Sequence, residues 1–215
     1  MVGEITLNDF NVSTYGISNY VVDSTVKNEM KVFVKAKIMN EGPLNVEVDL
    51  PLQGDLRTFR CKGSLGTMKL FPVNGMLEPA LSMIFKGGTL TRMTFDFTGT
   101  DNVSKGWMEF LYKDLDVVVL GKESGKEKGF VSWMANAVTL SNNPVNGKVI
   151  KAVEIGFERD KNKGIIGYIW RTIQSGLVRT ILPTNKYVIK KTQAQEESKK
   201  EKKAEEKKDK DKKGK

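Results

Sequence analysis

The residue types that most often carry out chemistry in proteins are nearly missing from this sequence. It contains no histidine, which is the commonest general base and a frequent ligand of transition metals. The single cysteine, Cys61, can form neither an internal disulfide nor a cysteine-rich zinc site, and without histidine it lacks its usual activating partner. We therefore expect Cys61 to be a small, half-buried residue of a strand.

Two pairs of carboxylates remain as candidates. Asp114 and Asp116 lie two residues apart in a strand-like pattern, so they could share a face and hold a cation, although a solvated strand face explains them better. Glu158 and Asp160 flank Arg159 and predict a turn whose charges pair locally. No phosphate-binding loop, nucleophile elbow or zinc-protease motif occurs. The sequence thus predicts a protein that is not an enzyme and that needs no metal or cofactor.

The net charge of +9 is concentrated at one end of the sequence. Residues 186–215 hold 13 Lys and 7 Asp or Glu, which leaves a surplus of only three positive charges elsewhere. Nucleic-acid binding requires Lys and Arg clustered on a folded surface, so we do not expect it. No apolar stretch approaches the roughly 20 residues of a spanning helix, and the first residues do not resemble a signal peptide. The chain is therefore expected to be either cytoplasmic or, as its strand-like start favours, a fragment of a longer protein.

Alternating apolar and polar residues predict a β-rich region over residues 1–128. The clearest case is a hairpin, in which Met30–Asn40 and Leu44–Leu50 are strands joined by a turn at Glu41-Gly42-Pro43. Residues 76–84 fit either a short helix or a strand. Further strands are expected at 57–62, 63–70, 103–112 and 115–120, together with one that Gly87-Gly88 opens. This spacing predicts a twisted, largely antiparallel, groove-like sheet.

A helix–strand–helix region of the same domain is expected over residues 129–190. The spacing of apolar residues predicts an amphipathic helix at 130–138, a strand at 148–158 and a second amphipathic helix that Pro183 ends. Residues 191–215 are rich in Lys and Glu and predict a disordered tail. The expected fold class is therefore mainly β with two amphipathic C-terminal helices.

Four short motifs follow one another between Tyr112 and Val178: YKDLDVVVL, GFVSWMANAVTLSNNP, VEIGFERD and GYIWRTIQSGLV. Their order and spacing resemble the C-terminal region of AsmA-like cell-envelope proteins, especially the Bacteroidetes type, over roughly residues 60–183. Family members are longer and carry an N-terminal membrane anchor, and the Lys/Glu tail departs from their pattern. The residues at matching places are Tyr112, Asp114, Leu115, Phe130, Ala135, Asn136, Asn142, Asn143, Pro144, Arg159, Asp160, Tyr168, Trp170, Arg171, Ser175 and Gly176.

The resemblance implies a periplasmic, inner-membrane-anchored protein whose β-groove carries phospholipid toward the outer membrane or influences outer-membrane assembly. A sheet with one apolar face suits acyl chains, since burial contributes about 0.8 kcal/mol per methylene without any chemistry. If helices cover that face instead, the chain is a β-rich protein-binding scaffold with no lipid role. Phospholipid, a membrane surface and envelope proteins are the expected partners. The best-defined lipid-binding candidates are Val32, Val34, Ile38, Val46, Val48 and Leu50.

The helix expected from Ile166 to Ile181 carries an apolar stripe that allows three interpretations. The stripe can pack onto the sheet. It can also lie on a lipid surface, with Arg171 and Arg179 at its flanks, or dock onto a partner protein. The candidate residues for a membrane or partner contact are Ile166, Ile169, Trp170, Ile173 and Leu177.

Overall fold

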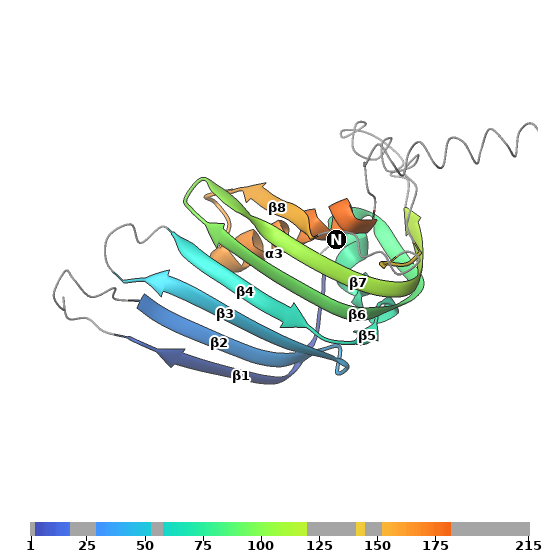
Figure 1. The fold of residues 1–215 in the computed structure, drawn as a ribbon, viewed down its shortest axis with the longest axis horizontal. Helices are drawn as coiled ribbons and strands as arrows, with labels where there is room; N and C mark the ends of the chain where they lie inside the picture. Colours follow the sequence, from blue (N-terminus) through green and yellow to red (C-terminus); the bar gives the residue numbers. More distant parts are fainter. Residues whose placement is uncertain (1–2, 18–28, 53–57, 120–140, 145–151, 182–215) are drawn as a thin grey trace, which may run out of the picture.

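The computed structural model of the 215-residue chain describes residues 3–17, 29–52, 58–119, 141–144 and 152–181. In this part of the chain, eight antiparallel strands form one open, twisted sheet in the order β1-β2-β3-β4-β6-β7-β8, with β5 paired to β6 (Figure 1). The predicted mainly antiparallel β fold is thus confirmed. The strands are β1 Leu7–Tyr15, β2 Glu29–Ile38, β3 Gly42–Pro51, β4 Phe59–Leu65, β5 Met68–Lys69, β6 Met83–Gly99, β7 Val103–Val119 and β8 Val153–Glu158.

Strand boundaries were predicted less well than strand identity. The hairpin of β2 and β3 is confirmed, with Val32 opposite Val48 and Val34 opposite Val46. The prediction of two separate strands at 57–62 and 63–70 is wrong. One strand, β4, extends across the expected boundary, and only the short β5 follows it. Those expected at 103–112 and 115–120 form the single strand β7. Pairing of β6 with β7 continues through three register shifts, so local irregularity does not end either strand.

Two α-helices lie within the described residues. The ambiguous segment at 76–84 belongs mostly to α1, Asn74–Leu81, which follows a short 3₁₀ turn η1, Phe71–Val73. Ser82 adopts a left-handed conformation with φ 52° and ends α1, so that β6 begins at Met83. The predicted helix from Ile166 is confirmed as α3, Ile165–Ile181. The helix expected at 130–138 and the tail expected at 191–215 lie outside the described residues.

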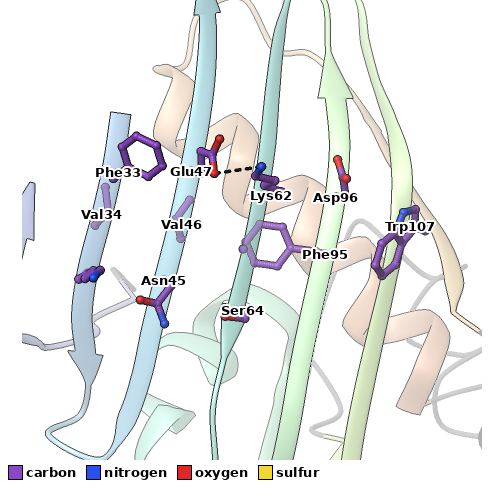
Figure 2. Close-up of a pocket in the computed structure, with 12 residues that line it drawn as sticks. Phe33, Val34, Asn45, Val46, Glu47, Lys62, Ser64, Phe95, Asp96 and Trp107 are labelled. Atoms are coloured by element: carbon purple, nitrogen blue, oxygen red, sulfur yellow. Dashed lines mark ion pairs between the residues drawn. The ribbon is translucent and has the colours of Figure 1, made fainter. Parts of the chain in front are cut away.

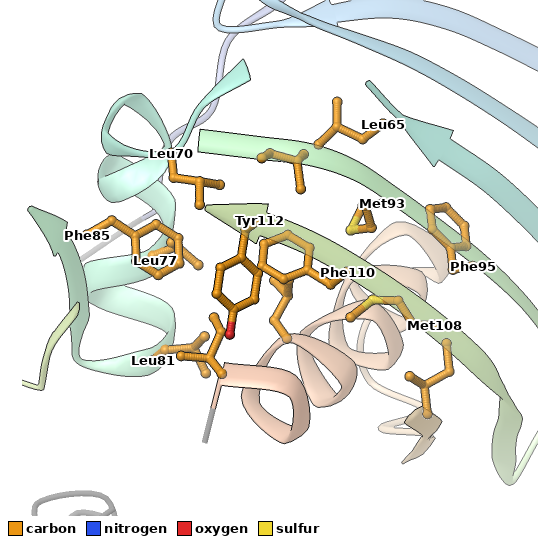
Figure 3. Packing of buried hydrophobic residues seen from close by; sticks show 14 of the residues in the cluster. Leu65, Leu70, Leu77, Leu81, Phe85, Met93, Phe95, Met108, Phe110 and Tyr112 are labelled. Atoms are coloured by element: carbon orange, nitrogen blue, oxygen red, sulfur yellow. The ribbon is translucent and has the colours of Figure 1, made fainter. Parts of the chain in front are cut away.

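Alternation gives the sheet an inner face, on which the helices pack, and an outer face. Residues opposite one another share a face, so Val48, Cys61 and Phe97 belong together on the inner one. The core forms where this face meets the helices, and Figure 3 shows Leu77 and Leu81 of α1 close to Phe85 and Tyr112. Each such buried side chain contributes about 1.5–3 kcal/mol.

The helix α3 sits unusually close to β7 and β8. A Cβ atom at Gly176 would lie 2.5 Å from Ile155 Cγ2 and 2.7 Å from Met108 Cε, so only glycine permits this approach. Buried hydroxyls fix the contact, because the oxygens of Ser104 and Thr172 lie 2.6 Å apart. The inner face of β7 and β8 is therefore closely covered.

The helix α1 is tied to the segment that precedes β1. Pro79 lacks the N–H that would bond to the carbonyl of Gly75 within the helix. The N–H of Glu4 donates to that carbonyl instead, at 3.1 Å. The Asn74 amide group also exchanges two 2.8 Å hydrogen bonds with the backbone of Phe85 in β6. These bonds hold α1 at the end of the sheet where β6 begins.

Candidate ligand-binding surface

The predicted lipid-binding residues lie together on the inner face of β2 and β3. Val32, Val48 and Cys61 lie opposite one another across neighbouring strands, and so do Val34, Val46 and Gly63. Val12 of β1 extends this row, since it lies opposite Val34. The candidates Val32, Val34, Ile38, Val46, Val48 and Leu50 are all partly buried rather than fully buried.

The described helices contact the other half of this face. The main contacts of α3 are with β7 and β8, and those of α1 are with β6 and η1. Figure 1 likewise shows both helices behind the β6–β8 side of the sheet. We call the inner-face residues of β4 and β6–β8 the covered half. We call seven accessible apolar residues on the inner face of β1–β3 the open half: Val12, Val32, Val34, Ile38, Val46, Val48 and Leu50. Ala36 of the same face is buried, at 6% exposure.

Exposure changes steeply between the two halves. Cys61 is fully buried and Phe97 is 1% exposed, whereas Val12 at the far edge is 47% exposed. Ile38, Val46, Val48 and Leu50 still pack against the core, so the open half is a continuation of it. The arrangement offers a long apolar surface that is buried at one end and accessible at the other. The sequence did not indicate Val12, because a β-bulge between Asn8 and Asn11 breaks the alternation in β1.

The stripe on α3 faces largely toward the sheet. Leu177 is buried, and Ile169, Trp170 and Ile173 pack against the core. Only Ile166 projects, at 80% exposure. Four of the five residues proposed for a membrane or partner contact are thus engaged within the molecule, as in the sheet-packing interpretation of this stripe.

The outer face is a charged surface on which opposite charges pair across strands. Lys62 lies 3.0 Å from Glu47, and Arg60 binds Asp96 through two hydrogen bonds of 2.9 and 2.6 Å. The hydrogen bond and charge of Arg60 lower the pKa of Asp96. Between these pairs, a shallow pocket of about 380 Å³ lies over Gly63, with Phe33 at one side and Trp107 at the other (Figure 2). Sequence inspection did not identify this pocket, because its residues come from five separate strands.

Cys61 and the candidate carboxylates lie in environments that give them little chemical reactivity. Burial raises the pKa of the Cys61 thiol to about 12, which suppresses its reactive thiolate. Asp114 and Asp116 are both exposed, and Asp160 pairs with Lys163 in the turn before α3. Within the described ranges, no group of three or more potential ligands could hold a metal ion.

Several residues that carry the AsmA-like resemblance meet in space. The backbones of Tyr112 and Asn143 pair through two hydrogen bonds of 2.9 Å, and the Asn142 side chain accepts one from the N–H of Asp114. In a second cluster, Arg159 lies over the ring of Tyr168, 5.6 Å from its centroid. The contacts of these residues hold the 141–144 segment and α3 to the sheet, so their observed role is architectural.

Comparisons with known proteins add no relative. No family model matches the chain, and neither a curated protein nor a solved structure is similar to it. None of the described helices is long and apolar enough to cross a membrane. The AsmA-like resemblance therefore stays a prediction.

Proposed function

We propose that this chain is a non-enzymatic, lipid-handling module of the AsmA-like kind, and that the open half of its inner face binds the acyl chains of phospholipid. One observation carries the proposal. The apolar face of the sheet extends past the described helices onto β1–β3, where its residues are partly buried and Val12 is 47% exposed. In this role the module acts in the bacterial envelope, in phospholipid transport toward the outer membrane or in its assembly.

Apolar burial supplies the binding energy in this proposal. An acyl chain lying along β2 and β3 covers Val34, Val46 and Val48, and each methylene that leaves water contributes about 0.8 kcal/mol. The seven residues of the open half are all apolar, so the ligand has no polar group to satisfy among them. Such a surface binds chains without recognising a particular headgroup, which suits a carrier of mixed phospholipids.

The test is a charge placed in the middle of the open half. In Val34→Glu, a carboxylate replaces the side chain that lies between Val12 and Val46. Water reaches this face when lipid is absent, so the variant should fold. Its co-purified phospholipid, measured by extraction and mass spectrometry, should fall several-fold relative to wild type.

A matched control puts the same residue one position along the strand. Lys35→Glu changes the exposed outer face and should leave the lipid content unchanged. A folded Val34→Glu protein with the lipid content of wild type would refute the proposal, and so would wild-type protein that carries no phospholipid. If Val34→Glu unfolds, an unpaired carboxylate has been forced into a closed core, and the chain is a protein-binding scaffold with no lipid role.

A further inference from the structure

The two edge strands of the sheet, β8 and β1, differ in whether other elements bond to their outward backbone groups. At the β8 edge, the N–H of Gly156 donates to the Ser175 hydroxyl at 3.1 Å, and Arg179 donates to the carbonyl of Glu154 at 2.7 Å. Helix α3 thus satisfies backbone groups of this edge strand. At the opposite edge, β1 pairs with β2, and within the described residues no other strand or helix bonds to it.

The β1 edge also concentrates exposed apolar side chains. Leu7, Phe10, Val12 and Tyr15 are 42–62% exposed, although they occupy one nine-residue strand. Edge strands are usually protected by Lys, by Pro or by a bulge, because their free N–H and C=O groups recruit other strands. Of these devices β1 has only its bulge, and its single charge, Asp9, is already paired with Lys37 at 2.8 Å.

We infer that β1 is a dimerisation edge, which pairs antiparallel with β1 of a second copy of this chain. The segment Phe10–Val12 is its own complement around Asn11, whereas the bulge between Asn8 and Asn11 takes Leu7 and Asn8 out of this match. A two-fold axis at Asn11 puts Phe10 of each copy opposite Val12 of the other copy, so that apolar side chains meet. Each Asp9 carboxylate is paired with Lys37 of its own copy at 2.8 Å, which reduces repulsion between the two copies.

Pairing of this kind joins the two open halves. Val12 lies opposite Val34 in its own copy, so the apolar row runs from β3 through β1 into the second copy without interruption. The covered halves and their helices then stand at the two ends of one continuous sheet. The dimer goes beyond the lipid proposal and does not depend on it, since the pairing requires only β1.

A cysteine on the two-fold axis tests this register in the full chain. In Asn11→Cys, the two Cα atoms should lie about 4.5–5.5 Å apart, within the range that a disulfide spans. Mild oxidation should therefore produce a covalent dimer. Ser13→Cys is the matched control, because its two copies lie about 13 Å apart and should not cross-link. Cys61 does not interfere, since burial raises the pKa of its thiol to about 12.

Solution mass measures the interface itself. Light scattering from micromolar to millimolar concentration should give a dimer for wild type and a monomer for Val12→Lys, which puts like charges into the paired edge. Ile166→Lys, at an 80% exposed site on α3, should remain dimeric. Wild-type protein that is monomeric throughout overturns the inference. Equal cross-linking of Asn11→Cys and Ser13→Cys overturns the register, as does a dimer that Val12→Lys leaves intact.

Discussion

The covered half and the open half of the inner face are built from the same alternation of apolar residues, but only one has described helices packed on it. The covered half holds aromatic and Met side chains such as Phe97 and Met108, which are 0–1% exposed. The open half is mostly Val, and its residues are partly exposed. A strand pattern thus identifies which face is apolar, while the bulk and burial of its side chains differ with what lies over it.

The largest expected difference between the halves is in thiol reactivity. Cys61 in the covered half is buried, and a rise in its pKa from 9.0 to about 12 reduces its thiolate about a thousandfold. A cysteine introduced in the open half by Val34→Cys should react with a thiol reagent near pH 8 faster than Cys61 by a factor of this order. Rates are measured on native protein, with unfolded protein as the reference. Comparable native rates would show that the open half is closed.

A smaller difference is expected in the cost of removing side chains. Phe97→Ala leaves a cavity in the covered half and should lower the free energy of unfolding by about 3–5 kcal/mol. Val48→Ala in the open half removes two partly exposed methyl groups and should cost only about 1 kcal/mol. Denaturant titration measures both variants. A cost for Val48→Ala close to that for Phe97→Ala would mean that both halves belong to one closed core.

The smallest effect concerns a polar atom inside the covered half. The buried hydroxyl of Tyr112 has no hydrogen-bond partner among the residues that the structure describes, and burial also raises the pKa of this residue. Tyr112→Phe removes the unsatisfied group and keeps the ring, so unfolding free energy should stay unchanged or rise by up to about 1 kcal/mol. A clear loss of stability would show that the hydroxyl has a partner in solution.

Local patterns in the sequence were sufficient for some elements and insufficient for others. Val32, Val34, Val46 and Val48 alternate with polar residues without interruption, so the hairpin and its apolar face could be predicted. The long strands β6 and β7 were cut short in the prediction, because Gly88 and the residues around Asp114 resemble turns. Their pairing with one another overrides these local signals, and no single-strand pattern contains that information.

The candidate surface shows the same division. The sequence alone showed the absence of histidine, the apolar row of β2 and β3 and the amphipathic stripe of α3. Only the tertiary structure decided that α3 packs beside β8 and caps its edge, since this depends on Gly176 meeting Met108 and Ile155 from distant segments. It likewise decided which edge of the sheet remains unpaired in the described chain. Side-chain periodicity is local, so it can be predicted from the sequence. Whether a helix covers a given face of the sheet depends on contacts between residues far apart in the chain.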